Sequence, residues 1–359
     1  MKKIGLSLLF LFSIGRSFSQ IGGNTSFSYL GLPIPARTAA LGGSSIALKD
    51  DDITTAYQNP ANLSEKTSNS LSGSYINFLG AVNYGYLAYG RSFKNIGHFA
   101  LGIQDIGYGT IQERDEYGNL TGTTYKSNDY NFSLMYARDK DSLWSYGVTL
   151  KTLYSKYGFY SSVASALDFG VTYNKASKGF TLAATIQNLG VQWKGYNGGK
   201  KAALPFNVAI SLAKKFKHAP FRFVITYDYL NRPNLVYQLP TDTQTVDPFT
   251  HQPIKKHPFG KFMDDFMRHF IFATEVIITK NLFIRIGFNY KMRKELSLTN
   301  KQGIAGFSFG LGFKISKIQF SYAYTQVSPV YGMNSITVAT NLNSFIKVKK
   351  PEPAPATTP

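Results

Sequence analysis

The sequence contains no cysteine, two tryptophans and five histidines among its 359 residues. Without cysteine the chain has no disulfides and no thiolate chemistry. The histidines form neither an H-x-x-x-H nor an HExxH pattern, which disfavours a metalloprotease. The G-x-S-x-G motif of serine hydrolases is also missing. These absences disfavour common hydrolase classes and direct attention to other roles.

Long apolar runs are missing as well. After residue 19 no run reaches the ~18–20 residues that a transmembrane helix needs. The chain begins with two lysines, a short apolar core and a small-x-small sequence over 17–19. This order is typical of a secretory signal peptide. We therefore predict a signal peptide over 1–19, with cleavage near Ser19–Gln20, and an exported protein.

Acidic residues are about half as frequent as basic ones, with 20 Asp and Glu against 39 Lys and Arg and a net charge of +19. In an exported chain, a basic surface suits anionic lipid or glycolipid. No Lys/Arg-rich arm or recognition-helix pattern is present, so we expect no nucleic-acid partner.

Aromatic residues and glycine are abundant, with 24 tyrosines, 28 phenylalanines and 32 glycines. From about Ser70 apolar and polar residues alternate with a period of two, most clearly over 282–291 and 304–315. Charged residues in such stretches, for example Asp168 and Arg222, fall on the polar face. This is the pattern of strands in a transmembrane barrel. We predict an all-β protein that forms an outer-membrane β-barrel.

The predicted barrel covers residues 70–345 and has about fourteen antiparallel strands, an even number that suits a single-chain barrel. Connections after even-numbered strands are short, whereas those at 108–128, 189–204 and 231–268 are long. Short periplasmic turns and longer outer loops are typical of such barrels, so both barrel ends should be periplasmic. The predicted strands cover 70–79, 83–91, 96–107, 129–137, 142–154, 164–174, 179–188, 205–215, 220–230, 269–279, 282–293, 303–314, 317–326 and 334–345.

Both flanks of the barrel differ from it. The tail over 346–359 is basic and then proline-rich, and we expect it to be disordered in the periplasm. Residues 20–69 lack strand periodicity, and we predict that they form a plug, or hatch, inside the barrel. Its ends should lie on the periplasmic side.

The predicted plug contains a small-residue block, an acidic triplet over 50–52 and an Asn-Pro-Ala turn over 59–61. The triplet lacks the D-x-D-x-D-G spacing of a calcium loop, so a solvated or barrel-internal turn paired with basic residues is favoured. The predicted inward-facing partners of the triplet are Lys151, Arg222, Arg285 and Lys291.

Two further stretches allow alternative interpretations. Residues 261–268 carry apolar side chains at helical spacing, which predicts a short helix that folds over the barrel mouth or docks a partner. Ser211 and Lys214 match the S-x-x-K motif of penicillin-binding enzymes, but in a strand they point to opposite faces. An enzyme such as a lipase embedded in the barrel lacks a nucleophile, base and orienting group. We therefore predict no enzyme and no catalytic, cofactor-binding or metal-binding residue.

The small-residue block ARTAALGG (36–43), the acidic triplet and NPANL (59–63) resemble the N-terminal region of the FadL-type outer-membrane barrels. Residues 204–223 (LPFNVAISLAKKFKHAPFRF) and 303–326 (GIAGFSFGLGFKISKIQFSYAYTQ) are similar to the PorV–PorQ barrels of the type IX secretion system of Bacteroidetes. The LPF…KHAP stretch favours the PorQ branch of that family over the PorV branch. The resemblance runs through most of the chain after the signal peptide.

This resemblance implies a fourteen-stranded barrel with an internal hatch and a non-catalytic role. It implies a component of the attachment complex that anchors PorZ at the cell surface beside PorU and PorV. Cargo is processed there and joined to anionic lipopolysaccharide, so outer-membrane lipid and lipopolysaccharide are implied partners too. The alternatives are a FadL-type transporter of hydrophobic molecules and a PorV-like cargo shuttle of the same system.

Overall fold

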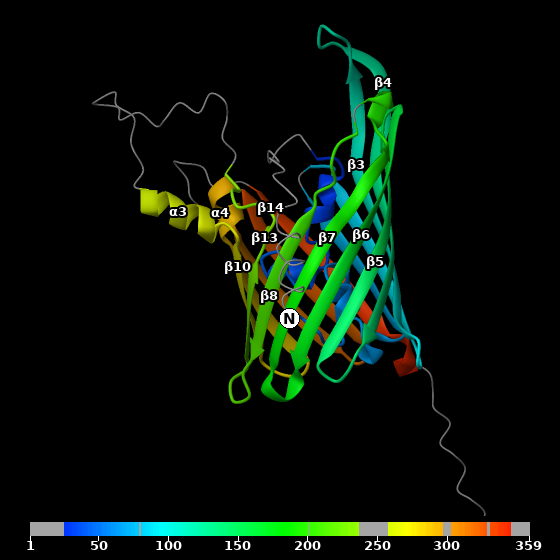
Figure 1. Ribbon diagram of the computed structural model, residues 1–359. Helices are drawn as coiled ribbons and strands as arrows, with labels where there is room; N and C mark the ends of the chain where they lie inside the picture. Colours follow the sequence, from blue (N-terminus) through cyan, green and yellow to red (C-terminus); the bar gives the residue numbers. More distant parts are fainter. Residues whose placement is uncertain are drawn as a thin grey trace, which may run out of the picture.

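The computed structural model describes residues 25–78, 80–199, 201–236, 258–296, 303–328 and 331–345 (Figure 1). The predicted signal peptide over 1–19 and the predicted tail over 346–359 lie outside these residues. Within the described part of the chain, no helix is both long and apolar enough to cross a bilayer.

Fourteen antiparallel strands form one closed barrel, as the sequence predicts. Each strand pairs with its neighbours in sequence, and β1 closes the ring against β14 with Ser70 opposite Asn341. The strands are β1 (Ser70–Asn77), β2 (Asn83–Phe93), β3 (Gly97–Arg114), β4 (Leu120–Asp139), β5 (Trp144–Tyr157), β6 (Tyr160–Lys175), β7 (Phe180–Lys194), β8 (Asn207–Lys215), β9 (Phe221–Tyr227), β10 (Phe270–Ile277), β11 (Leu282–Asn289), β12 (Phe307–Ile315), β13 (Ile318–Ser328) and β14 (Tyr331–Asn341).

Side chains alternate between a polar interior and an apolar exterior along these strands. In β12, Phe309, Leu311 and Phe313 are exposed, whereas Ser308 between the outward positions is buried. A wall with this alternation satisfies its backbone by strand pairing and presents an apolar surface to lipid. The inward positions predicted for Asp168 and Arg222 are confirmed, since both side chains make contacts inside the barrel.

Two rows of aromatic side chains ring the outer surface. Toward the short turns, Phe93 contacts Phe99, and Trp144 contacts Tyr173. Toward the long connections, Phe288 packs on Phe307 with ring centroids 4.7 Å apart. Such girdles lie at the two membrane–water interfaces of outer-membrane barrels.

The long-loop rim is uneven in height (Figure 1). β3 and β4 have 18 and 20 residues, whereas β9 and β10 have 7 and 8. The prediction of a loop over 108–128 is therefore wrong, because β3 and β4 continue as a hairpin. Many residues at the hairpin end are polar and exposed, so the apolar alternation used to find strands is lost there. We call β3–β7 the high wall and β8–β14 the low rim.

The other two predicted loops also contain regular structure. β7 continues to Lys194 and is followed by the 3-10 helix η6 (Tyr196–Gly198), within the loop predicted over 189–204. The predicted helix near 261–268 is confirmed as α3 (Pro258–Met267). The strand predicted over 282–293 ends earlier, because helix α4 (Tyr290–Leu296) follows β11 directly. α3 packs on the outer side of the low rim, so the prediction that it folds over the mouth is wrong.

Residues 25–69, here called the lumenal segment, run inside the ring of strands. The segment contains η1 (Ser28–Gly31), α2 (Ala36–Ala40), η2 (Ile53–Tyr57), η3 (Pro60–Asn62) and η4 (Glu65–Thr67). α2 contacts β11, β12, β13 and β14, whereas η3 contacts β4, β5 and β6. One short segment that touches such separated strands must lie in the lumen.

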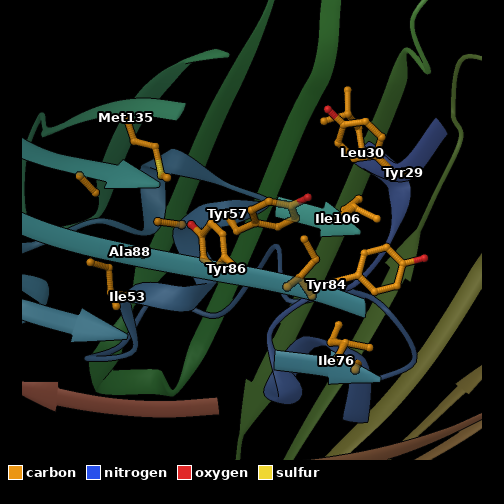
Figure 2. Close-up of a cluster of buried hydrophobic side chains, with 14 of the residues drawn as sticks. Tyr29, Leu30, Ile53, Tyr57, Ile76, Tyr84, Tyr86, Ala88, Ile106 and Met135 are labelled. Carbon is orange, nitrogen blue, oxygen red and sulfur yellow. The ribbon is translucent and has the colours of Figure 1, made fainter. Parts of the chain in front are cut away.

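A buried apolar cluster joins the lumenal segment to β1–β4 (Figure 2). Tyr57 packs edge-on against Tyr86 of β2, with ring centroids 5.1 Å apart. Ile53 and Tyr57 come from η2, whereas Ala88 and Met135 come from the wall. The interior of the barrel is therefore a packed core on this side.

The two ends of the lumenal segment lie at different ends of the barrel. Its last residues stay at the short-turn end, where the Asn341 side chain donates to the carbonyl of Ser68. Its first described residue, Thr25, forms a bridge with Ala203 in the long connection between β7 and β8. The prediction that both ends of residues 20–69 are periplasmic is therefore not met by the described part, which begins at Thr25 beside the long connections, and residues 20–24 lie outside the described residues.

Inward-facing glycines make room for the lumenal segment. A Cβ atom at Gly147 would lie 2.7 Å from the backbone nitrogen of Ala61, and one at Gly170 would overlap the Asn59 side chain. On β11, a Cβ atom at Gly287 would overlap the backbone of Gly42, just after α2. Glycine at these inward positions thus lets the backbone of the lumenal segment approach the backbone of the strands closely.

We expect Gly170→Ala to destabilise the folded barrel, because its methyl group displaces the Asn59 side chain. Overpacking of this kind costs about 1–3 kcal/mol. The measurement is thermal unfolding of the purified protein. Gly85→Ala is the matched control, since a Cβ there has nothing within 4 Å. Equal unfolding temperatures for the two variants would contradict this account.

Candidate functional site

A cluster of charged side chains fixes the lumenal segment to the wall. Arg37 of α2 lies 2.7 Å from Asp50 and 3.2 Å from Asp52. Its guanidinium also reaches Glu275 of β10, at 3.1 Å. Asp52 in addition caps η2 by accepting from the Thr54 backbone at 2.9 Å. Arg37 therefore joins the acidic turn to the barrel.

Two arginines of the wall complete the cluster. Arg222 of β9 bridges Asp50 at 3.0 Å and Glu275 at 2.8 Å, and Arg285 of β11 contacts Glu275 at 2.8 Å. Three guanidiniums therefore face three carboxylates, including Asp52. Buried charges persist only when they are paired and hydrogen-bonded, so the balance is required by the surroundings.

The partners predicted for the acidic triplet are partly confirmed. Arg222 contacts Asp50, as predicted. Arg285 contacts Glu275 instead, and Lys151 pairs with Asp168 at 2.6 Å. Lys291 is not on a strand, since it belongs to α4 and lies over the Tyr229 ring.

Sequence reasoning missed the two central members of the cluster, Arg37 and Glu275. Each has a signal in the sequence. Arg37 is the only charged residue in the small-residue block over 36–45, and Glu275 is the only one in β10. A lone charge in an apolar or small-residue context is costly unless it is paired, which marks it for a specific contact.

The Asn-Pro-Ala turn forms a second attachment point. The Asn59 amide donates to the Ile46 carbonyl and to the Thr172 hydroxyl of β6, both at 2.9 Å. Its side-chain oxygen accepts from the Ala61 backbone at 3.0 Å. The predicted turn is confirmed, and it also joins the segment to β6.

A cavity of about 190 Å³ lies between the lumenal segment, strands β5, β7 and β8, and the residues that follow β9. The segment contributes apolar side chains to its lining, among them Leu30, Ile46 and Tyr57. The wall contributes polar ones, including Gln187 and Asn207. The cavity is thus amphipathic, and it is smaller than the roughly 300–1,000 Å³ of ordinary ligand pockets.

β7 bends where the wall borders this cavity. Asn188 has a left-handed φ of 57°, and its amide donates to the Pro205 carbonyl at 3.0 Å. The ladder between β7 and β8 ends at Gln187 opposite Asn207, although β7 continues to Lys194. Beyond Gln187, the described part of β7 pairs only with β6. The strand ladder therefore ends on the β8 side next to the cavity, and residues 202–205 contact β7 there through side chains instead.

An ion pair supports this bend from inside. The Lys151 ammonium lies 2.6 Å from the Asp168 carboxylate and donates to Asn188 at 2.8 Å. Asp168 also accepts from the Asn188 backbone at 2.7 Å. The three side chains hold the left-handed residue in place, and Lys151 lines the cavity.

The mouth side of the cavity is formed by residues after β9. The Lys291 ammonium lies 4.2 Å from the centre of the Tyr229 ring, and the Arg232 guanidinium lies 5.8 Å from it. Asp228 accepts from Asn207 at 2.7 Å, and its burial raises the pKa of this carboxyl. With Lys151 neutralised by Asp168, two cations and one carboxyl remain to face a ligand.

The described residues do not assemble a catalytic site of the kinds considered from the sequence. Ser211 faces the interior and bonds to Thr226, whereas Lys214 donates to the Lys178 carbonyl on the exposed side. The two residues of the S-x-x-K motif therefore point apart, as predicted. Within the described part of the chain, no group of three His, Asp or Glu residues could hold a metal ion.

No family model and no curated protein matches the chain. Among solved structures, the deltaS2S3 mutant of the monoaromatic hydrocarbon channel TodX has a TM-score of 0.50 and 11% identity, covering 86% of this chain and 99% of that one. The Pseudomonas putida toluene transporter TodX has a TM-score of 0.49 and 10% identity, covering 86% and 97%. A Pseudomonas aeruginosa FadL homologue has a TM-score of 0.48 and 9% identity, covering 86% and 98%.

At such identities the likeness shows a shared fold alone. The fold is that of FadL-type outer-membrane barrels, which confirms the predicted fold class. The resemblance to the PorV–PorQ barrels stays a prediction.

We expect Asp50→Lys to loosen the lumenal segment, because it places a cation beside Arg37 and Arg222. Breaking a buried pair costs about 3–5 kcal/mol. Ion conductance of the barrel in planar bilayers should rise. Asp51→Lys is the matched control, because Asp51 is exposed and no ion pair involves it among the described residues. Unchanged conductance for Asp50→Lys would contradict a sealing role of the segment.

Proposed function

We propose that the protein is an outer-membrane channel for small amphipathic or hydrophobic molecules. The cavity between the lumenal segment and strands β7 and β8 is the binding site in this proposal. The observation that carries it is the position of the cavity against the bend in β7, where the ladder to β8 has ended. A bound molecule there has apolar side chains on one side and, on the other, the place where the β7–β8 ladder ends and only side chains close the wall.

The chemistry of the cavity supports a ligand with a small polar head. Leu30, Ile46 and Tyr57 can cover an apolar body. Lys291 and Arg232 supply positive charge for an anionic or hydrogen-bonding head. The fold likeness to a monoaromatic hydrocarbon channel agrees with such a ligand at the level of analogy.

The rest of the described lumen limits the route. On the β1–β4 side the lumen is filled by the packed apolar cluster, and polar contacts to the lumenal segment, such as Gln104 with Tyr57 at 3.2 Å, lie within it. A hydrophobic molecule has no apolar path straight down the axis. The proposal therefore routes it from the mouth into the cavity and out beside β7.

The test is the uptake of radiolabelled toluene and octanoate by bacterial cells that lack other barrels of this type. Cells with the protein should accumulate at least one of the two probes faster than cells without it. Gly31→Trp should reduce this uptake to background, because Gly31 lines the cavity and a Cβ there has nothing within 4 Å. The indole then occupies the binding site.

The control for this test is Gly85→Trp. A Cβ at Gly85 is equally free of contacts, and residue 85 alternates with the inward-facing Tyr84 and Tyr86. Uptake by this variant should stay at the wild-type level. If wild-type cells accumulate neither probe above background, the channel proposal is wrong.

We propose as the second candidate that the protein anchors a surface partner. This is the attachment-complex role, with PorZ held beside PorU and PorV next to lipopolysaccharide. The observation that favours it is the β3–β4 hairpin, which rises above the low rim and exposes Tyr117 and Leu120 near its tip (Figure 1). A PorV-like cargo shuttle would use the same exposed surface.

The experiment for the second candidate is to shorten the β3–β4 hairpin by removing residues 111–124 and closing it with a short turn. Barrel assembly should persist, because the paired core of β3 and β4 from His98 to Gly107 remains. In affinity purification from outer membranes, PorZ should co-elute with the wild type and should be lost from the eluate of the shortened variant. Retention of PorZ would exclude the hairpin as its anchor, and absence of PorZ from the wild-type eluate would exclude the role.

A further inference from the structure

Helix α3 exposes an apolar face that does not pack against the barrel interior. Phe259 and Phe262 are 68% and 63% exposed, and Met263 and Phe266 are 38% and 40% exposed. The spacing of these four residues places them on one side of the helix. An exposed apolar face of this size marks a site that contacts a membrane or another protein.

This face is continuous with the lipid-facing surface of the barrel. The Phe266 ring lies 5.1 Å from Phe270 and 6.0 Å from Tyr227, measured between centroids. Phe270 in turn stacks on Phe272 at 5.7 Å. Ile271 between them is buried toward the lumen, so Phe270 and Phe272 point outward. Figure 1 shows α3 running outward from the low rim.

The height of α3 is that of the outer aromatic girdle. Phe272 is in register with Phe288 of β11, and Phe288 is in register with Phe307 of β12. These aromatics mark the outer membrane–water interface of the low rim. α3 precedes β10 directly, so it lies beside this row and not high above it.

The opposite side of α3 is polar and is fixed to α4. Asp264 lies 2.8 Å from Arg268 and 3.0 Å from Lys294, and it accepts from the Tyr290 hydroxyl at 2.9 Å. Burial acts to raise the pKa of Asp264, but the bonds from Lys294 and Arg268 outweigh it and lower that pKa. The contacts hold the polar side toward α4, which leaves the apolar side facing away.

We propose that α3 is an interfacial helix that lies on the outer leaflet and buries its apolar face at the boundary of headgroups and acyl chains. The occupant of this face is lipid, because the face extends the lipid-facing aromatic surface of β9 and β10. Lys261 on the polar side is exposed and lies where it can contact anionic headgroups, whereas Arg268 is held by Asp264. The helix thereby fixes the low rim to the membrane surface.

The test uses tryptophan fluorescence of the full chain in vesicles of phosphatidylglycerol and acyl-brominated phosphatidylcholine. Trp144→Phe and Trp193→Phe remove the two native tryptophans, and Phe262→Trp places a single reporter on the apolar face. Its emission should be blue-shifted, and brominated lipid should quench most of it. Lys261→Trp, one residue earlier on the polar side, is the matched control and should emit as in water.

Three results would overturn the proposal. The Phe262→Trp reporter could emit as in water and escape quenching, which would place the face in solvent. It could be blue-shifted but unquenched in a dimeric sample, which would mean that a second copy covers it. It could emit as in water in pure vesicles and become protected only in native outer membranes, which would identify a protein partner. Assembly of each variant is checked by heat-dependent migration of the barrel.

Discussion

Charge balance inside the lumen is the constraint on which the rest of the structure depends. Three arginines and three carboxylates meet at α2, the acidic turn and strands β9–β11. None of these groups can lose its partner without leaving a charge in a poorly solvated interior. The strand register is tied to this balance, because a slip of one residue in β10 would turn Glu275 toward lipid.

The same constraint explains why the lumenal segment is irregular. A regular helix would satisfy its own backbone and a strand would need a partner strand along its length, and neither could follow the inner surface of a tilted barrel. Short helical turns capped by Asp52 and Asn59 let the chain change direction while side chains close the open backbone groups. Inward glycines such as Gly147 and Gly170 then allow close approach to the wall. The remaining cavity lies where the wall itself bends, at Asn188.

The sequence was sufficient for the barrel and much less so for its contents. Alternation with a period of two located all fourteen strands, because lipid on one face and polar contacts on the other impose it on every strand. It failed above the low rim, where the β3–β4 hairpin faces water on both sides. It also failed after β11, where the first residues of α4 could be read as a continuation of the strand. Arg222 was identified as a partner of Asp50, but the contacts of Arg37 depend on a fold of the chain that no local pattern encodes.

The uneven rim gives the barrel a front and a back within the plane of the membrane. Among the described residues, the strands of the β3–β7 side reach farther above the membrane than those of the β8–β14 side (Figure 1). A small molecule or a protein domain that approaches the mouth therefore meets strands of unequal height on its two sides. A contact between two such barrels, or between a barrel and a neighbouring protein, therefore changes when one barrel is rotated about the membrane normal. This asymmetry gives the barrel a defined direction in the membrane plane, although the molecule is otherwise free to rotate in the bilayer.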